Sequence, residues 1–495
     1  MSAVQEIPER QARRTQVAAA LSRALAPESI LVAKEDLRPY ECDGLSAYRE
    51  TPMVAAIPAS EPEVAAVLAV AREAGVPVVA RGSGTGLSGG ALPHADGILL
   101  SLAKFNRVLE VDALARTARV QPGVTNLRIS QHVAPLGLYY APDPSSQIAC
   151  SIGGNVAENS GGVHCLKYGL TVHNILRVRA LTIEGDTLEL GAEALDAPGY
   201  DLLAVITGSE GLLAITLEIT VKLLPKPEAA QVVMASFADV EAAGAAVASV
   251  IGAGIVPAGL EMMDKLATSA VEGFVHAGYD LEAEAILLAE SDGTREEVAD
   301  EIERMIAVMR ASGATDVRVS TSEAERLRFW SGRKGAFPAV GRISPDYYCI
   351  DGSIPRAALG RVLSTIGELS AHYNLRCANV FHAGDGNLHP LILYDANIPG
   401  ELERTEAFAR DILELCIEVG GTITGEHGVG VEKINQMCTQ FRAAELAQFH
   451  AVKAAFDPQG LLNPGKGVPT LHRCAEYGAM RVKGGALPHP ELPRF

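Results

Sequence analysis

The apolar positions of residues 51–228 alternate between the two-residue period of strands and the longer period of helices. The segment Ser60-Glu61-Pro62-Glu63 has the spacing of a capping box, which predicts a helix through Gly75. Short apolar runs predict buried strands, and a hairpin turned at 184–186 is predicted from two runs separated by Glu-Gly-Asp. The predicted strands cover 76–80, 98–102, 109–112, 117–120, 174–183 and 187–190.

The next part of the chain repeats a strand–helix–strand pattern twice. The predicted elements are, in order, 232–237, 240–253, 255–261, 285–290, 295–311 and 316–320. Two such units in series predict a ferredoxin-like α/β sheet. We therefore divide this α+β protein into a helical lead-in at 1–50, a first domain at 51–228, a second at 229–432, and a helical segment with a Pro/Gly-rich tail at 433–495.

Composition narrows the class of protein. A chain of 495 residues is expected to hold roughly three domains. Its formal charge of -18 argues against a nucleic-acid partner, since phosphate binding requires a basic surface. The eight cysteines form no CxxC pair, and the N-terminus lacks the apolar run of a signal peptide. These features predict a cytoplasmic protein with reduced thiols and without its own iron-sulfur cluster.

Three loops rich in glycine and serine follow predicted elements of the first domain. The first, residues 81–90, contains a GxGxxG pattern directly after a strand, but another strand follows it where a Rossmann fold has a helix. The second covers 150–162 and follows Pro142-Asp143-Pro144, and the third is Gly208-Ser209-Glu210-Gly211. Free backbone N–H groups in such loops can enclose the phosphates of a large dinucleotide.

A possible metal site lies in the second domain. His382 and His389 flank a tight Gly-Asp-Gly-Asn turn, and Glu426 follows 37 residues later among glycines. Two imidazoles and one carboxylate can bind a divalent ion and leave positions open for substrate. The alternative is a glycine-rich hairpin whose histidines cap turns. Asp385 and Asn387 are interpreted as turn residues.

These blocks carry a family resemblance. RGSGTGLSGG, PDPSS, CSIGGNVAENSGG and GSEGLLAIT resemble the flavin domain of the vanillyl-alcohol-oxidase/PCMH superfamily. FHAGDGNLHP, GEHGVG and FDPQGLLNPGK resemble its glycolate oxidase and D-lactate dehydrogenase branch, and the closing stretch 471–495 is similar to the tail of a bacterial member. The resemblance implies a PCMH-type FAD-binding domain, a ferredoxin-like substrate or cap domain, and a C-terminus that returns to the FAD domain.

The resemblance also implies a set of cofactor contacts. It implies FAD, bound non-covalently because the first loop has no histidine to attach it. Glu210 and Ile215 are expected nearer the adenine side. The full set implied for FAD is Arg81, Gly82, Ser83, Gly84, Thr85, Gly86, Leu87, Ser88, Pro142, Asp143, Ser151, Gly154, Asn155, Gly161, Glu210, Gly211, Ile215, Asn463 and Lys466.

For the second domain, the resemblance assigns a divalent metal (Zn, Mn or Fe) to His382, His389 and Glu426. His427 is the candidate base, which would take the hydroxyl proton of a 2-hydroxy acid while a hydride passes to flavin N5. Arg333 matches an arginine that binds the substrate carboxylate, with Lys334 and Arg342 as alternatives. The pair Tyr347-Tyr348 is interpreted as strand packing.

The expected reaction is oxidation of glycolate to glyoxylate, and also of D-lactate to pyruvate. Phe337 and Cys349 stand where 2-hydroxyglutarate relatives have Thr and Lys contacts, so a small monocarboxylate is preferred. D-lactate as the main substrate, a non-catalytic flavin subunit, and a metallohydrolase with a glycine-rich accessory domain are the alternatives. The resemblance further implies a second flavin subunit and an iron-sulfur subunit, and a peripheral position at the inner membrane face through these partners.

Overall fold

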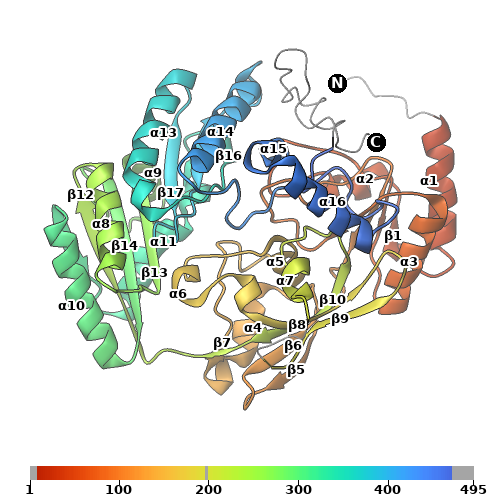
Figure 1. The fold of residues 1–495 in the computed structure, drawn as a ribbon, viewed down its shortest axis with the longest axis horizontal. Coiled ribbons are helices and arrows are strands. Elements are labelled where there is room, and N and C mark those ends of the chain that lie inside the picture. Colours follow the sequence, from red (N-terminus) through yellow and green to blue (C-terminus); the bar gives the residue numbers. More distant parts are fainter. Residues whose placement is uncertain (1–7, 195–198, 471–495) are drawn as a thin grey trace.

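The computed structural model describes residues 8–194 and 199–470, and Figure 1 shows its layers. The stretch 471–495, including Cys474 and the tail similar to a bacterial relative, lies outside the described residues. Within the described ranges, no helix combines the length and apolar character needed to cross a membrane.

The first sheet has four short strands in the order β1-β2-β4-β3, and β4 runs parallel to both of its neighbours. A glycine-rich loop joins β3 directly to β4 without a helix, as the sequence predicts. Helices α1 and α3 pack on this sheet through residues such as Leu21 and Leu68. The elements are α1 (Pro8–Leu21), β1 (Ile30–Leu31), α2 (Lys34–Leu37), β2 (Val54–Ala56), α3 (Glu61–Ala74), β3 (Val78–Arg81) and β4 (Ile98–Ser101).

The predicted capping box at the start of α3 forms only in part. The Glu63 carboxylate accepts hydrogen bonds from the Ala59 backbone N–H at 2.8 Å and from the Ser60 hydroxyl at 3.1 Å. The Ser60 hydroxyl accepts no bond from the helix. Because its hydroxyl points to Glu63, the first N–H groups of the helix are not capped by this side chain.

The second sheet is antiparallel, in the order β5-β6-β10-β8-β9, and the predicted hairpin forms its β8–β9 edge. Its inner face packs against α4 and α5 around Ile129 and Val156. The elements here are β5 (Val108–Asp112), β6 (Thr117–Val120), α4 (Asn126–Val133), β7 (Leu138–Tyr139), α5 (Ile152–Glu158), α6 (Cys165–Tyr168), β8 (Ile175–Leu181), β9 (Thr187–Gly191), α7 (Leu202–Ile206), β10 (Ile215–Lys222) and β11 (Leu224–Pro225).

The third sheet has seven strands in the order β15-β12-β14-β13-β17-β18-β16. Its first four strands have the order and antiparallel pairing of a ferredoxin-like motif, which confirms the prediction from the repeated pattern. The elements are β12 (Ala229–Phe237), α8 (Val240–Gly252), β13 (Gly259–Asp264), α9 (Lys265–Val275), β14 (Ala285–Gly293), α10 (Arg295–Ala311), β15 (Asp316–Val319), α11 (Glu323–Lys334), α12 (Ala336–Val340), β16 (Asp346–Cys349), α13 (Leu359–Tyr373), β17 (Cys377–Phe381), β18 (Pro390–Tyr394) and α14 (Glu401–Glu418).

Both faces of this sheet are covered, which explains why its strands read as continuous apolar runs. Along β14, Leu287 joins the cluster under α8 and α10, whereas Leu288 joins the cluster under α9 and α11. Strand β13 begins four residues later than predicted, after Pro257. Proline has no N–H to donate to a neighbouring strand, so the ladder cannot include it.

After the third sheet the chain returns to the first one. Helices α15 (Met437–Gln440) and α16 (Ala443–Phe456) lead to a short segment that lies beside β3. There the Val78 N–H donates to the Leu461 carbonyl and the Asn463 N–H to the Val78 carbonyl, both at 2.8 Å. Figure 1 draws both helices in blue, and Met437 of α15 and Leu446 of α16 belong to the hydrophobic cluster of the third sheet.

Candidate active site

The three glycine- and serine-rich loops meet around one cavity of about 540 Å³. The loop after β3, the start of α5 and the loop before β10 each form part of its wall. Of the residues implied for FAD, those that line this cavity are Arg81, Gly82, Ser83, Gly84, Thr85, Gly86, Leu87, Ser151, Gly154, Asn155, Glu210, Gly211 and Ile215.

Two positions of the first loop require glycine because neighbouring side chains lie too close for a Cβ atom. A Cβ on Gly82 would lie 2.1 Å from the Ser151 hydroxyl, which accepts a bond from the Gly154 N–H at the start of α5. Gly84 has φ +68°, and a Cβ there would meet the Arg81 guanidinium. The loop can therefore lie flat against its neighbours and present its backbone to the cavity.

Six residues implied for FAD are not among those that line the cavity. Ser88 and Gly161 lie behind the wall: the Ser88 carbonyl accepts from the Val431 and Glu432 N–H groups, and Gly161 faces Glu426. The other four support the loops from outside and are Pro142, Asp143, Asn463 and Lys466. Asn463 Nδ2, for example, donates to the Gly90 carbonyl at 2.9 Å, so the segment after α16 fixes the first loop.

The cavity wall also includes residues that were not predicted from the sequence. Five of them lie inside the quoted motifs, which was the available signal, and Pro122 lies outside them; the five are Ser145, Ser146, Glu158, Ser160 and Ser209. Glu158 is notable because its Oε2 is buried and has no hydrogen-bond partner among the described residues. Burial, with the nearby Glu210 carboxylate, raises the pKa of Glu158 well above its usual range.

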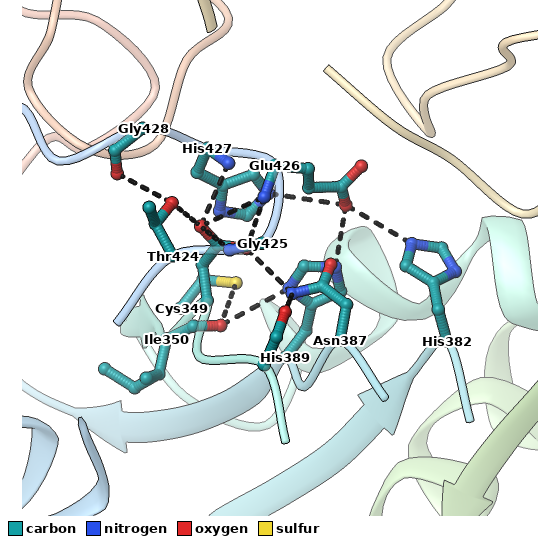
Figure 2. A network of polar contacts seen from close by, with 12 residues as sticks. Cys349, Ile350, His382, Asn387, His389, Thr424, Gly425, Glu426, His427 and Gly428 are labelled. Atoms are coloured by element: carbon teal, nitrogen blue, oxygen red, sulfur yellow. Dashed lines mark hydrogen bonds and ion pairs between the residues drawn. The ribbon is translucent and has the colours of Figure 1, made fainter. Parts of the chain in front are cut away.

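The two histidines of the second domain lie at the end of a β-hairpin, as their spacing predicts. His382 directly follows β17 and His389 directly precedes β18, and these strands pair antiparallel. In the turn between them, the Asn387 N–H donates to Asp385 Oδ1 at 3.0 Å, the local bond expected of a turn residue. Both imidazoles therefore point to one spot beyond the sheet (Figure 2).

Glu426 completes this group, which we call the His–Glu cluster (His382, His389 and Glu426). Its Oε1 lies 3.2 Å from His382 Nε2 and 2.8 Å from His389 Nε2, between the two rings in Figure 2. Asp351, fully buried, holds the loop in place by accepting from the backbone N–H groups of Glu426 and His427. The ligand atoms of the three side chains all lie within 4.8 Å of one another.

The surroundings of the two histidines determine which nitrogen faces this spot. His382 Nδ1 lies 2.7 Å from Glu261 Oε1, and His389 Nδ1 lies 3.3 Å from the Ile350 carbonyl. Because both partners are acceptors, each Nδ1 can donate to its partner, which leaves each Nε2 to face Glu426. Two imidazole nitrogens and a carboxylate oxygen that converge in this way are a donor set that fits a divalent ion.

The pKa of His382 leads to the same conclusion. Burial opposes a positive charge on this ring, but the carboxylates of Glu261 and Glu426 outweigh it and raise its pKa well above the usual range. A positive charge is therefore favoured at this spot, supplied by a proton or by a metal ion.

Glu261 connects the His–Glu cluster to Arg333. Its second oxygen accepts from Arg333 Nε at 2.6 Å, and both side chains are 1% exposed. The two terminal nitrogens of Arg333, Nη1 and Nη2, are buried and have no hydrogen-bond partner among the described residues. Arg333 is not among the residues that line the large cavity, whereas its neighbour Lys334 is. Arg342 instead donates to the Gly273 carbonyl on α9.

His427 lines the same cavity as the glycine loops, together with His389 and Glu426. Its Nδ1 is buried without a hydrogen-bond partner in the part of the chain that the structure describes. Burial lowers the pKa of His427 to about 4, opposed by the Asp351 carboxylate and assisted by His389. The ring is therefore neutral near pH 7 and can accept a proton.

The wall opposite the glycine loops belongs to the second domain. It includes Phe337, Pro338 and Tyr347, and the rings of Phe337 and Tyr347 meet edge to face with centroids 5.7 Å apart. The sequence predicts strand packing for both Tyr347 and Tyr348. Tyr348 is buried in this way, but Tyr347 borders the cavity.

Comparison with known proteins agrees with this arrangement. The family model "FAD binding domain" matches residues 52–191, and the model "FAD linked oxidases, C-terminal domain" matches residues 226–467. A cavity walled by glycine loops fits the flavin cofactor. The chain therefore belongs to the FAD-linked oxidase family, as a flavin-dependent oxidoreductase.

Individual relatives show which members of the family the chain resembles. The chain is 63% identical to "Glycolate oxidase subunit GlcD" of Escherichia coli (strain K12), over 97% of each chain. It is 32% identical to "D-lactate dehydrogenase" of Anaerostipes hadrus, over 90% of this chain and 95% of that one. Among solved structures, p-cresol methylhydroxylase with substrate bound shares the fold at a TM-score of 0.79 and 17% identity, over 93% of this chain and 98% of that one.

Proposed function

We propose that this protein oxidises glycolate to glyoxylate, with D-lactate as a second substrate. Oxidation of a hydroxy acid by an FAD-linked enzyme is what the named relatives share. The observation that carries the proposal is the single cavity whose wall runs from the glycine loops to His389, Glu426 and His427. A substrate bound there would have the flavin on one side and a histidine base with a cation site on the other.

The substrate carboxylate requires a positive partner in a protein of net charge -18. Arg333 is the candidate for this role because its Nη1 and Nη2 are buried and unpartnered among the described residues, while Glu261 holds its Nε; it does not itself line the cavity. A planar pair of N–H donors fits a carboxylate bidentately. Lys334, at the cavity wall, supplies a further positive charge near the same end of α11.

The size of the substrate is limited by the wall of the second domain. Phe337 and Tyr347 present aromatic rings to the cavity and offer no positive charge to a second carboxylate. A buried, unpaired carboxylate is costly, so a dicarboxylic hydroxy acid would be disfavoured. This supports a small monocarboxylate such as glycolate.

The chemistry divides between the bound groups and the residues of the chain. FAD, when bound by the loops around Gly82 and Ser151, would accept the hydride from the carbinol carbon. A divalent ion held by the His–Glu cluster would lower the pKa of the substrate hydroxyl. His427, neutral and with a free nitrogen, would then accept the hydroxyl proton.

We further propose that the chain works in a multi-subunit complex. A relative 63% identical to it is named a subunit. The chain has no CxxC pair for an iron-sulfur cluster. A second flavin subunit and an iron-sulfur subunit would take the electrons onward and could hold the complex at the inner face of a membrane.

Dye-linked oxidation by the purified, FAD-loaded protein tests the substrate proposal. Glycolate, D-lactate, L-lactate and D-2-hydroxyglutarate are compared at equal concentration, with and without the partner subunits. We expect the largest kcat/KM for glycolate and a smaller one for D-lactate. A larger value for D-lactate would favour the alternative that D-lactate is the main substrate. No oxidation of any acid with partners present would favour a non-catalytic flavin subunit.

A further inference from the structure

A second group of possible metal ligands lies beside the His–Glu cluster. Cys349, His389 and His427 bring one ligand atom each to within 4.8 Å of one another. This group has His389 in common with the His–Glu cluster, but its other members are a thiol and the proposed base. We call it the Cys–His group.

Local structure holds the three side chains in place. Cys349 is the last residue of β16, and its Sγ lies 3.6 Å from the Ile350 carbonyl, the same carbonyl that faces His389 Nδ1 at 3.3 Å. The rings of His389 and His427 stack with centroids 4.8 Å apart and an angle of 12° between their planes. Figure 2 shows the Cys349 sulfur, the two rings and Glu426 gathered in one region.

Two features point to a ligand in this group. His427 Nδ1 is buried without a partner in the described part of the chain, which is costly unless something binds it. His389 and His427 both line the large cavity, so an ion that enters the cavity can reach both rings.

The two groups differ in the ions they prefer. The His–Glu cluster offers two nitrogens and an oxygen, which suit manganese, iron or zinc alike. The Cys–His group offers sulfur and two nitrogens, a softer set that suits zinc and cadmium and disfavours manganese. Because His389 belongs to both groups, an ion bound in one group prevents an ion from binding in the other.

We propose that the Cys–His group is an inhibitory site for soft divalent cations such as Zn²⁺ and Cd²⁺. Binding displaces the Cys349 thiol proton to solvent, forms the metal–sulfur bond and occupies both His389 and His427. The base is then a metal ligand and cannot accept the substrate proton. The inhibition rests on the proposed function, but binding of the ion to the thiol does not.

The experiment uses the full-length, FAD-loaded protein and adds Cd²⁺, Zn²⁺ or Mn²⁺ to the wild type, Cys349→Ser, and Cys377→Ser as a matched control. Cys377 is also a buried strand cysteine, but it lies on β17 outside the group. The first readout is the ultraviolet charge-transfer absorption of a cadmium–thiolate bond, which requires no turnover. The second is the ion concentration that halves the dye-linked rate, relative to each variant's own rate without the added ion.

We expect Cd²⁺ to produce the absorption in the wild type and in Cys377→Ser but not in Cys349→Ser. His382→Asn, which alters only the His–Glu cluster, should keep the absorption. The half-inhibiting concentration of Cd²⁺ and Zn²⁺ should rise at least about tenfold in Cys349→Ser, since losing even a group that supports a ligand weakens metal binding by about 10–100-fold. Mn²⁺ should not inhibit any of the proteins.

Equal absorption in Cys349→Ser and wild type would overturn the site. Cadmium absorption that depends on Cys349 but leaves an active enzyme uninhibited would overturn the inhibitory role. If the protein oxidises no hydroxy acid, the absorption still decides whether the site binds the ion, so failure of the proposed function and failure of the site are distinguishable.

Discussion

Two histidine–carboxylate clusters in this protein differ in how completely their polar atoms are hydrogen-bonded. The first, which we call the junction cluster, is Asp143, His164 and Glu290. His164 Nδ1 lies 2.9 Å from Asp143 and its Nε2 3.3 Å from Glu290, and Arg326 and Trp330 bond to the other oxygen of Glu290. Every polar atom of the His164 ring thus has a partner, and the cluster joins the flavin-binding region to β14.

The His–Glu cluster and its neighbours are left incomplete in the described chain. His427 Nδ1 and the terminal nitrogens of Arg333 are buried and unpartnered, and the Nε2 atoms of His382 and His389 converge on one carboxylate oxygen. Buried polar atoms without partners cost free energy, so a protein retains them where a ligand completes them. The comparison teaches that the cluster with unpartnered neighbours is the candidate for chemistry, and the fully partnered junction cluster the candidate for structure.

The largest effect is expected from removing the proposed base. His427→Ala should lower kcat for glycolate by roughly 10²–10⁴, because proton transfer by a positioned side chain contributes that much. Steady-state kinetics measures the loss, and the flavin absorption spectrum checks that FAD stays bound. A loss of less than about fivefold would contradict the role of His427.

Glu261→Gln tests whether the carboxylate between His382 and Arg333 positions both. It keeps the shape but removes the charge that orients the His382 ring, so affinity for the metal should fall by about 10–100-fold. Metal content after dialysis against a weak chelator is the measurement. Glu290→Gln, the equivalent change in the junction cluster, is the control, and we expect it to keep its metal. Equal metal loss in both variants would indicate a general structural defect.

Arg333→Lys should raise KM for glycolate by about 10- to 100-fold, because bonds between charged groups are worth roughly 1.5–3 kcal/mol and lysine cannot reproduce a bidentate pair. Separate measurement of KM and kcat distinguishes a loss of substrate binding from a loss of chemistry. Lys334→Met, which changes the neighbouring cation at the cavity wall, should have a smaller effect on KM. A larger increase in KM for Lys334→Met than for Arg333→Lys would assign binding of the substrate carboxylate to Lys334 instead.

The smallest effect on activity is expected in the junction cluster. Burial opposes a charge on His164, but Asp143 and Glu290 raise its pKa from the usual 6.5 to about 10. A folded-state pKa above the unfolded one stabilises the protein below pH 6.5, and this stabilisation is lost as pH rises through 10. His164→Gln should therefore cost roughly 1.5–3 kcal/mol near pH 7 and much less near pH 10.

Denaturant unfolding of wild type and His164→Gln at the two pH values checks this, with kcat for glycolate measured alongside. If the difference in unfolding free energy between wild type and His164→Gln increased toward pH 10, His164 would not be stabilising the fold as a protonated side chain. A large loss of kcat at unchanged stability would indicate a catalytic rather than a structural role for His164.

Much of the fold and of the candidate site follows from local patterns in the sequence. The ferredoxin-like strand order follows from two strand–helix–strand repeats, and the meeting of His382 with His389 follows from a hairpin turn between them. These are short-range relations, which periodicity and turn residues record directly.

Long-range packing is what the sequence could not provide. Glu261 lies 121 residues from His382 and 72 from Arg333, and nothing in its own strand indicates that it bonds to both. The junction cluster likewise brings Asp143 to Glu290 through His164. The contribution of Tyr347 to the cavity depends on which face of β16 meets the glycine loops, which only the assembled sheets determine.

The central claim is that one cavity holds both the flavin and a metal-dependent hydroxy-acid site. The most direct test is anaerobic bleaching of the bound flavin by glycolate in a single turnover, before chelation, after chelation, and after Mn²⁺ is added back. We predict rapid bleaching, its loss on chelation, and its return with the metal. Bleaching that is indifferent to chelator, and unaffected by His382→Ala, would contradict the metal-dependent site.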